Sequence, residues 1–176
     1  KLDYTDMLVI GDTREQRPLD LAPLRTTRGT LRTGDYSIFG LEKSVAYERK
    51  SLADFVACCY GDNRTRFEAE LDRLMAYENR GILIEATMVD LMAGHWRSRI
   101  KPESVVGSYF AWSYMGIPIY LTGSRDGSIV ALRKLLYDSA KKRWLELSRF
   151  FFATAERQQA AVSSRPRKTS SPKDGR

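Results

Sequence analysis

The chain has 176 residues, of which 43% are hydrophobic, and a formal net charge of +7. This length is enough for one domain with its own core. No apolar run approaches the roughly 20 residues that a membrane-spanning helix needs, and no signal peptide is recognisable. Residues 163–176 contain five basic residues and one acidic residue, so four of the seven net charges lie there. The bulk charge therefore favours a polyanionic partner only weakly.

The N-terminal third of the sequence predicts strands. The apolar run MLVIGD (7–12) is typical of a buried strand, and residues 13–33 form a polar connection. The segments GDYSIFG (34–40) and SVAYERK (44–50) alternate in polarity on either side of a short turn around residues 41–43. This pattern predicts a β-hairpin.

Helices follow the hairpin. Ser51-x-x-Asp54 resembles a capping box and predicts a helix that begins at Ser51. The next segment, YGDNRTR (60–66), predicts a basic loop. Thr65-x-x-Glu68 then predicts the cap of a second helix.

The remaining segments alternate between strands and helices. They predict a buried strand at 81–86, a short helix capped by Thr87-x-x-Asp90, a helix at roughly 102–115, a strand at 117–123 and a long helix at 127–152. This order predicts an α/β fold, with a mixed sheet flanked by helices on both faces. We expect the folded domain to cover residues 1–153. Residues 154–176 form a basic tail that we expect to be disordered.

The two cysteines, Cys58 and Cys59, are adjacent in the sequence. Neighbouring cysteines rarely pair, so we expect two free thiols. This indicates a reducing, intracellular location, cytoplasmic or nuclear.

The hairpin register brings two acids together. If the turn occupies residues 40–43, Asp35 lies directly opposite Glu48, with Cβ atoms about 5 Å apart. Side chains alternate along a strand, so Lys50 shares the face of Glu48 and Arg49 does not.

Facing carboxylates repel each other, and a divalent cation would relieve that repulsion. Mg²⁺ takes carboxylate oxygens together with water and phosphate, and it acidifies a bound water. A neighbouring lysine can neutralise charge that develops during the reaction. Asp35, Glu48 and Lys50 therefore predict a site for phosphodiester hydrolysis, although an exposed charged hairpin would show the same short pattern.

Four motifs in this order resemble a known family. GDTRE (11–15), TGDY (33–36), ERKSLADF (48–55) and RTRFEAEL (64–71) resemble the nuclease domain of XPF-type structure-specific endonucleases, and the likeness covers roughly residues 8–150. The resemblance implies the PD-(D/E)xK fold, which is restriction-endonuclease-like.

The resemblance also implies roles for individual residues. By motif, Asp12, Asp35 and Glu48 match metal-binding acids for Mg²⁺ or Mn²⁺, and Lys50 matches the catalytic lysine. Further polar positions of the family motif correspond to Glu15, Arg49 and Asp54. As alternatives, Arg49 pairs only with Glu15 or Asp54, and Asp54 only caps its helix.

Several arginines are candidate DNA contacts. They are Arg14 after the first strand, Arg64 and Arg66, and the two arginines of HWRSR (95–99), Arg97 and Arg99. The alternative for each is ordinary solvated surface. The single histidine, His95, has no partner motif that would indicate zinc.

The sequence departs from the family in one respect. XPF-type nucleases usually carry helix-hairpin-helix modules after the nuclease domain, and here only the short basic tail follows. A separate DNA-binding module or partner subunit is therefore one option, and the preferred DNA structure stays open.

Together these patterns predict a Mg²⁺-dependent DNA endonuclease that acts on branched or structured DNA in repair or recombination. Two alternatives remain: a catalytically inactive DNA-binding subunit of the same fold, or a superfamily nuclease with a restriction or recombination role. The long helix carries an apolar stripe from Ile129 to Phe151, longer than a strand can cover. We therefore expect a homodimer through the C-terminal helix.

Overall fold

The computed structural model describes residues 2–163, with side chains described as far as residue 154. The predicted tail covers residues 154–176, and its part from residue 164 onward lies outside the described residues, so the boundary at 153 stays a prediction. The chain divides into two units, Lys1–Lys141 and Lys142–Arg176. Each unit is described by itself.

The first unit is built on a six-stranded mixed sheet with the order β2-β1-β3-β4-β5-β6. Its strands are β1 (Leu8–Asp12), β2 (Arg25–Gly29), β3 (Tyr36–Ile38), β4 (Val45–Ser51), β5 (Asn79–Glu85) and β6 (Ile119–Leu121). β3 is antiparallel to both β1 and β4, whereas the pairs β1–β2, β4–β5 and β5–β6 are parallel. The carboxyl ends of β1, β4 and β5 therefore lie at the same edge of the sheet.

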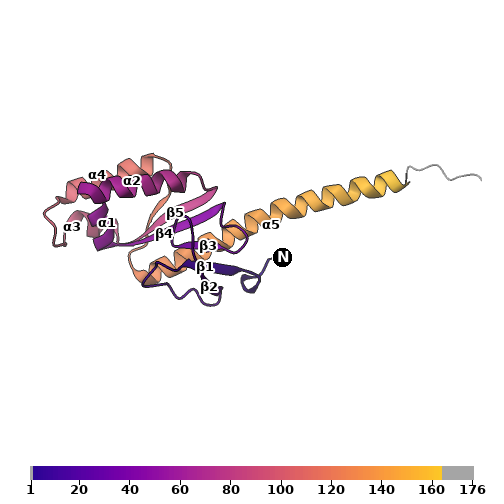
Figure 1. Cartoon of the computed structure of the whole chain (residues 1–176), viewed down its shortest axis with the longest axis horizontal. Coiled ribbons are helices and arrows are strands. Elements are labelled where there is room, and N and C mark those ends of the chain that lie inside the picture. The colour runs from indigo at the N-terminus through magenta and orange to yellow at the C-terminus, as the bar shows by residue number, and fades with distance from the viewer. Residues whose placement is uncertain (1, 164–176) are drawn as a thin grey trace, which may run out of the picture. The chain divides into compact units, whose positions relative to one another are not determined.

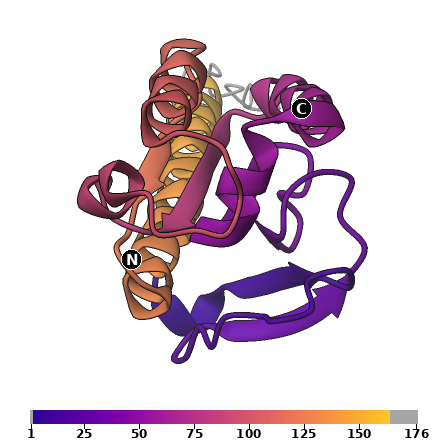
Figure 2. The ribbon, with the colours of Figure 1, turned by 90° about the vertical axis from the view of Figure 1, so that its left-hand side faces the viewer.

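Helices cover both faces of this sheet (Figure 1), as predicted. The elements are a 3₁₀ turn, η1 (Tyr4–Asp6), and the helices α1 (Leu52–Cys58), α2 (Gly61–Met75), α3 (Met88–Ala93), α4 (Pro102–Tyr114) and α5 (Arg125–Ser163). Helices α1 to α4 pack on one face around Phe55, Phe67 and Trp112. The first part of α5 packs on the other face through Leu132 and Leu136. Figure 2 shows β1 and β2 lying away from α3 and α4 within this unit.

The predicted hairpin and its register are confirmed. Tyr36 pairs with Tyr47, and the Asp35 N–H donates to the Tyr47 carbonyl at 2.8 Å. This register continues to Asp35 opposite Glu48. Gly34 has a φ of +80°, and a Cβ there would lie 3.0 Å from the Tyr47 carbonyl oxygen. Glycine therefore permits the close approach of the two backbones just before Asp35.

The region 13–33 is not only a connection, because it contains β2. This strand reads RTTRG, and four of its five residues are exposed. It pairs only with β1, at the edge of the sheet. A polar edge strand has no apolar alternation, which is the signal that strand prediction depends on.

The predicted basic loop at 60–66 is wrong. Helix α2 already begins at Gly61, and its N-cap, Tyr60, makes no side-chain capping bond. The extra turn is stabilised by Arg64, which lies 5.1 Å from the Trp112 ring centroid and donates to the Ser108 hydroxyl. The caps at Ser51 and Thr87 are confirmed.

Helix α5 extends to Ser163, beyond the predicted end at residue 152. In the first unit its buried side chains include Leu132, Leu136 and Ala140, which confirms that the first half of the predicted stripe packs on the sheet. In the second unit Trp144, Leu147 and Phe151 are exposed. A search of the described helices found none with the length and apolarity to cross a membrane.

Candidate active site

The end of β4 sends charged side chains to both faces of the sheet. Glu48 and Lys50 face α2, where the Lys50 ammonium lies 2.5 Å from a Glu48 carboxylate oxygen. It also lies 3.4 Å from a carboxylate oxygen of Glu70 on α2, and 5.3 Å from the Phe67 ring centroid. Burial alone would lower the pKa of Lys50, but Glu48 and Glu70 raise it above its ordinary value. The ammonium group therefore stays charged.

Asp35 and Glu48 line the same two cavities. One, of about 430 Å³, is also lined by Lys50 and Asp54, and the other, of about 250 Å³, is also lined by Glu70. A carboxylate oxygen of Asp35 accepts the backbone N–H of Arg49 at 2.9 Å. The predicted pair of acids and the lysine are thus brought together beside open space.

The environment opposes the ionisation of both acids. Burial raises the pKa of Asp35 to about 6, and the nearby Glu15 and Glu70 add to this rise. Burial also raises the pKa of Glu48 well above its ordinary value; Lys50 opposes the rise, whereas Asp35 and Glu70 add to it. A bound cation would offset both the desolvation and the mutual repulsion.

Arg49 points to the opposite face and holds an ion-pair network. Its guanidinium donates to both carboxylate oxygens of Glu85, at 2.8 and 2.9 Å, and lies 3.6 Å from Glu15. Arg125 lies 3.7 Å from Glu85 and donates to the carbonyl of Pro18. The predicted pairing with Glu15 is therefore present.

Asp12 is buried and its two carboxylate oxygens are already engaged. They accept hydrogen bonds from the Arg14 guanidinium at 2.7 and 3.1 Å and from the Leu31 N–H at 2.6 Å. Burial would raise the pKa of Asp12, but these hydrogen bonds lower it to about 2. The metal role of Asp12 and the DNA contact by Arg14 stay predictions. A metal at Asp12 would compete with the Arg14 guanidinium for the same carboxylate oxygens, whereas the Arg14 side chain is 68% exposed.

The donor set fits a metal held by two acids rather than three. Among the residues that the structure describes, no group of three His, Cys, Asp or Glu residues is arranged to hold a metal ion. Mg²⁺ is often bound through one or two carboxylates together with water and substrate phosphates. Asp35 and Glu48 supply such a pair beside a cavity.

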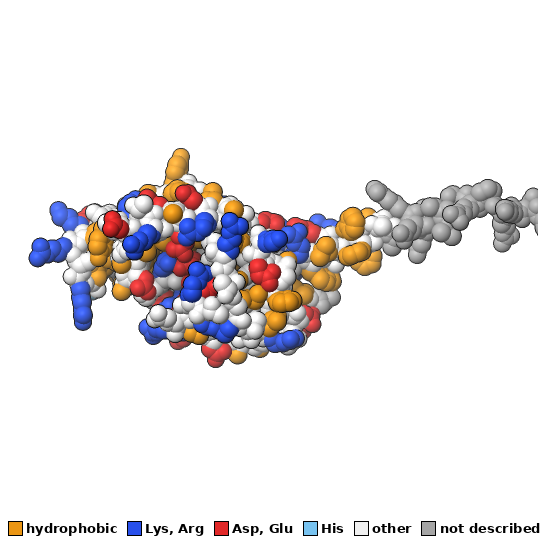
Figure 3. Space-filling model, in the orientation of Figure 1, with side chains coloured by type: hydrophobic (Ala, Val, Ile, Leu, Met, Phe, Trp, Pro, Cys, Tyr) orange, Lys and Arg blue, Asp and Glu red, His pale blue; other side chains and the backbone are white. Residues whose placement is uncertain are grey.

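The other predicted residues occupy varied positions. Asp54 accepts from the Ser51 hydroxyl at 2.6 Å in the α1 cap, which matches the alternative considered for it. Arg64 is engaged by Glu68 at 2.9 Å, within α2. The exposed side chains of Arg66, Arg97 and Arg99 have no hydrogen-bond or ion-pair partner in the described part of the chain. Figure 3 shows basic side chains projecting from the end of the first unit that carries the loop between α3 and α4.

Two residues of the site, Glu70 and Glu85, were not predicted from the sequence. Glu70 lies three residues after Phe67 and next to Leu71, both of which face the sheet from α2. Helical spacing therefore could have predicted that Glu70 lies near the core. Glu85 ends the buried strand β5, beside the end of β4, and a single acid at that position gave no other signal.

The same arrangement of strands and helices occurs in solved structures of XPF from Aeropyrum pernix. One is 24% identical, with a TM-score of 0.60, and the match covers 75% of this chain and 61% of that chain. The other, a complex with DNA, is 23% identical with a TM-score of 0.58, covering 77% of this chain and 66% of that chain. The chain has the fold of an XPF-type nuclease domain.

This XPF-type fold is the predicted restriction-endonuclease-like α/β architecture. The chain spans about three fifths to two thirds of the length of these XPF chains. No protein-family model and no curated protein matches the sequence.

The ion-pair network around Arg49 predicts that the loss of its guanidinium lowers the stability of the protein strongly. The Arg49 side chain is only 6% exposed. Its removal by Arg49→Met leaves the largely buried Glu15 without a cation, and leaves Glu85 with only Arg125, 3.7 Å away. We expect a loss of about 3–5 kcal/mol in the free energy of unfolding, measured with urea. Adding Glu85→Gln should recover part of this loss, because one buried charge disappears.

The matched control is Arg25→Met on the exposed strand β2, which should change stability little. An equal loss in the two single variants would contradict a stabilising role for the network.

Proposed function

We propose that this chain is a metal-dependent DNA endonuclease that hydrolyses phosphodiester bonds, with branched or structured DNA as its substrate. The observation that carries the proposal is the meeting of Asp35, Glu48 and Lys50 at one cavity. The XPF-type fold supports it, and so does the complex of one XPF structure with DNA. A role in DNA repair or recombination follows from this proposal.

The side chains have distinct tasks in this scheme. Asp35 and Glu48 would hold Mg²⁺ or Mn²⁺, which when bound would polarise the phosphoryl group and acidify a water. The Lys50 ammonium, kept charged by Glu48 and Glu70, lies where it can orient the attacking water or neutralise charge on the phosphate oxygens. Arg49 acts through its backbone N–H, which positions the Asp35 carboxylate.

Exposed basic side chains would supply contacts to the DNA backbone. Arg66, Arg97 and Arg99 are exposed and unpaired among the described residues, as phosphate contacts require. Arg64 is a weaker candidate because it is bound to Glu68 and Ser108. A separate DNA-binding module or partner subunit would supply further contacts.

The site is tested by removing its charges one at a time. Asp35→Asn and Glu48→Gln should each lower the cleavage rate by roughly 10²-fold or more in saturating Mg²⁺, while DNA binding survives. Lys50→Ala should lose a similar factor. The assay is single-turnover cleavage of labelled duplex, flap, splayed and four-way DNA, with Glu103→Gln on the exposed face of α4 as the control. Near-normal cleavage by the Asp35 or Glu48 variant would overturn the proposal.

An inactive DNA-binding subunit is the second candidate. It is favoured by Asp12, whose oxygens are occupied by Arg14 and Leu31. Under this alternative the wild-type chain binds the same four DNAs and cleaves none of them in either Mg²⁺ or Mn²⁺.

We also propose that the second unit mediates a homodimer. Between Trp144 and Phe152 six large apolar side chains are exposed, from 38% at Leu145 to 72% at Phe152. Figure 3 shows hydrophobic side chains gathered along this part of α5. An apolar group of this kind on a charged helix is typical of an interface.

The double variant Trp144→Glu/Phe151→Glu should be a soluble monomer, because it places charges in the proposed interface. Multi-angle light scattering at tens of micromolar should give twice the monomer mass for the wild-type chain and the monomer mass for the variant. As a control, Val130→Glu changes an exposed apolar residue in the first unit and should leave the dimer intact. A monomeric wild type would refute the interface.

Cys58 and Cys59 are both free thiols in the structure. We propose that the protein works in a reducing compartment, where such thiols persist.

A further inference from the structure

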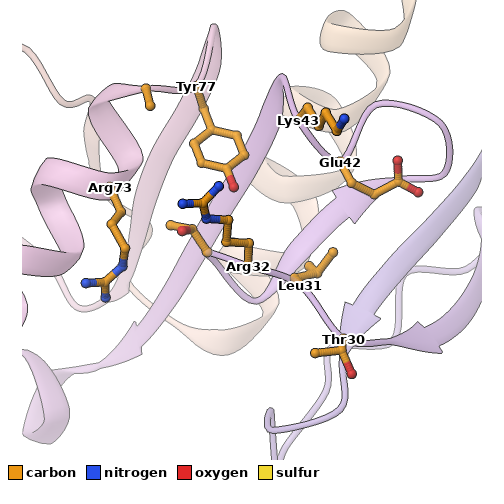
Figure 4. A pocket seen from close by; sticks show the side chains of 9 residues that line it. Thr30, Leu31, Arg32, Glu42, Lys43, Arg73 and Tyr77 are labelled. Carbon is orange, nitrogen blue, oxygen red and sulfur yellow. The ribbon is translucent and has the colours of Figure 1, made fainter.

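A larger cavity, of about 530 Å³, lies beside the candidate active site. Its walls come from the loop before β3, the hairpin turn and the end of α2, and Figure 4 shows their side chains. The apolar part of the lining is formed by Leu31, Ala76 and Tyr77. The volume is in the range of sites that hold small organic ligands, roughly 300–1,000 Å³.

This cavity borders the space in front of the acids. Arg32, Thr33 and Arg73 line it, and the same three residues line the 250 Å³ cavity that contains Asp35 and Glu48. A chain of nucleotides that places one phosphate at the acids can therefore continue past these two arginines.

The two arginines are available for a ligand. Neither guanidinium has an ion-pair or hydrogen-bond partner among the described residues, and both side chains are exposed. The lining also contains Lys43, whereas its one acid, Glu42, accepts the Gly40 N–H at 3.0 Å. The lining therefore carries a net positive charge and includes an apolar part.

The loop that carries Arg32 is held in place by Asp12 and Arg14, at the end of β1. The buried Asp12 accepts the Leu31 N–H at 2.6 Å, and Arg14 donates to the Leu31 carbonyl at 2.7 Å. Leu31 is itself buried. Arg32 is thus presented from a fixed backbone, which lowers the entropy that ligand binding has to overcome.

We propose that this cavity binds the nucleotide that neighbours the scissile phosphodiester. Arg32 and Arg73 contact its phosphate, with the planar, multidentate geometry that arginine offers to phosphate oxygens. The base packs against Leu31, Ala76 and Tyr77. The position next to the scissile bond rests on the proposed nuclease function, whereas nucleotide binding in the cavity does not.

A free nucleotide has the same phosphate and base as a nucleotide within a DNA strand. The experiment therefore distinguishes binding of a strand from binding of a free nucleotide. The probe is a fluorescent single-stranded thymidine 12-mer, bound without metal and followed by anisotropy over a range of salt concentrations. Arg32→Gln/Arg73→Gln is compared with Arg25→Gln/Lys141→Gln, which removes the same two charges from exposed positions outside the cavity. Thermal unfolding confirms that both variants fold.

The Arg32/Arg73 variant should bind the 12-mer about tenfold more weakly, as expected for a lost charge-assisted contact. Its slope of log K against log salt should fall by about 0.7 for one lost phosphate contact. The control should stay closer to the wild type in affinity. Equal losses in the two variants would overturn the proposal, because general charge would then explain the binding.

Two further arms test the base and the source of the nucleotide. The wild type should prefer the thymidine 12-mer over a 12-mer of abasic units, and Ala76→Phe, which fills the cavity, should reduce that preference. An unchanged preference would overturn the base site.

If thymidine 5′-monophosphate displaces the 12-mer as efficiently as unlabelled 12-mer does, the cavity serves a free nucleotide and the strand subsite is overturned. If the wild type passes these binding tests but cleaves no DNA, the proposed nuclease function is refuted and nucleotide binding in the cavity is not.

Discussion

Three consecutive charged residues, Glu48, Arg49 and Lys50, sit at the end of β4, a central strand of the sheet, and the rest of the site depends on their burial. Charges that leave water need partners, and strand alternation sends these three to opposite faces. Glu48 and Lys50 meet each other and Glu70 on the α2 side. Arg49 meets acids on the α5 side. A strand entering a core can therefore end in an acid and two bases only because acids on α2, on β5 and just after β1 lie within reach of the two bases.

The topology of the sheet explains how these partners assemble. β1, β4 and β5 run in the same direction, so their carboxyl ends share one edge of the sheet. Asp12 and Glu85 end β1 and β5 at that edge, and the cavities open beside it. Ligand sites in α/β sheets commonly lie at the carboxyl ends of strands. The same edge therefore serves both the ion pairs that stabilise the fold and the acids proposed to hold a metal.

The sequence allowed the central part of this arrangement to be predicted, because the relevant signals were local. The alternation in 34–50 set the hairpin register, and the register placed Asp35 opposite Glu48. Strand β2 was missed because a polar edge strand shows no alternation. The start of α2 was missed because Arg64 packs on Trp112, a contact between distant parts of the chain. Long-range contacts likewise explain the engagement of Asp12 by Leu31 and the roles of Glu70 and Glu85.

The central claim is that Asp35 and Glu48 form a pair that binds a divalent cation. The most direct measurement is a titration of the metal-free protein with Mn²⁺, in which electron paramagnetic resonance reports the free ion. The account predicts one class of bound Mn²⁺ in the wild type and in Glu103→Gln, with at least a tenfold weaker affinity in Asp35→Asn and in Glu48→Gln, about 1.4 kcal/mol or more. Unchanged Mn²⁺ binding in both site variants would contradict the account.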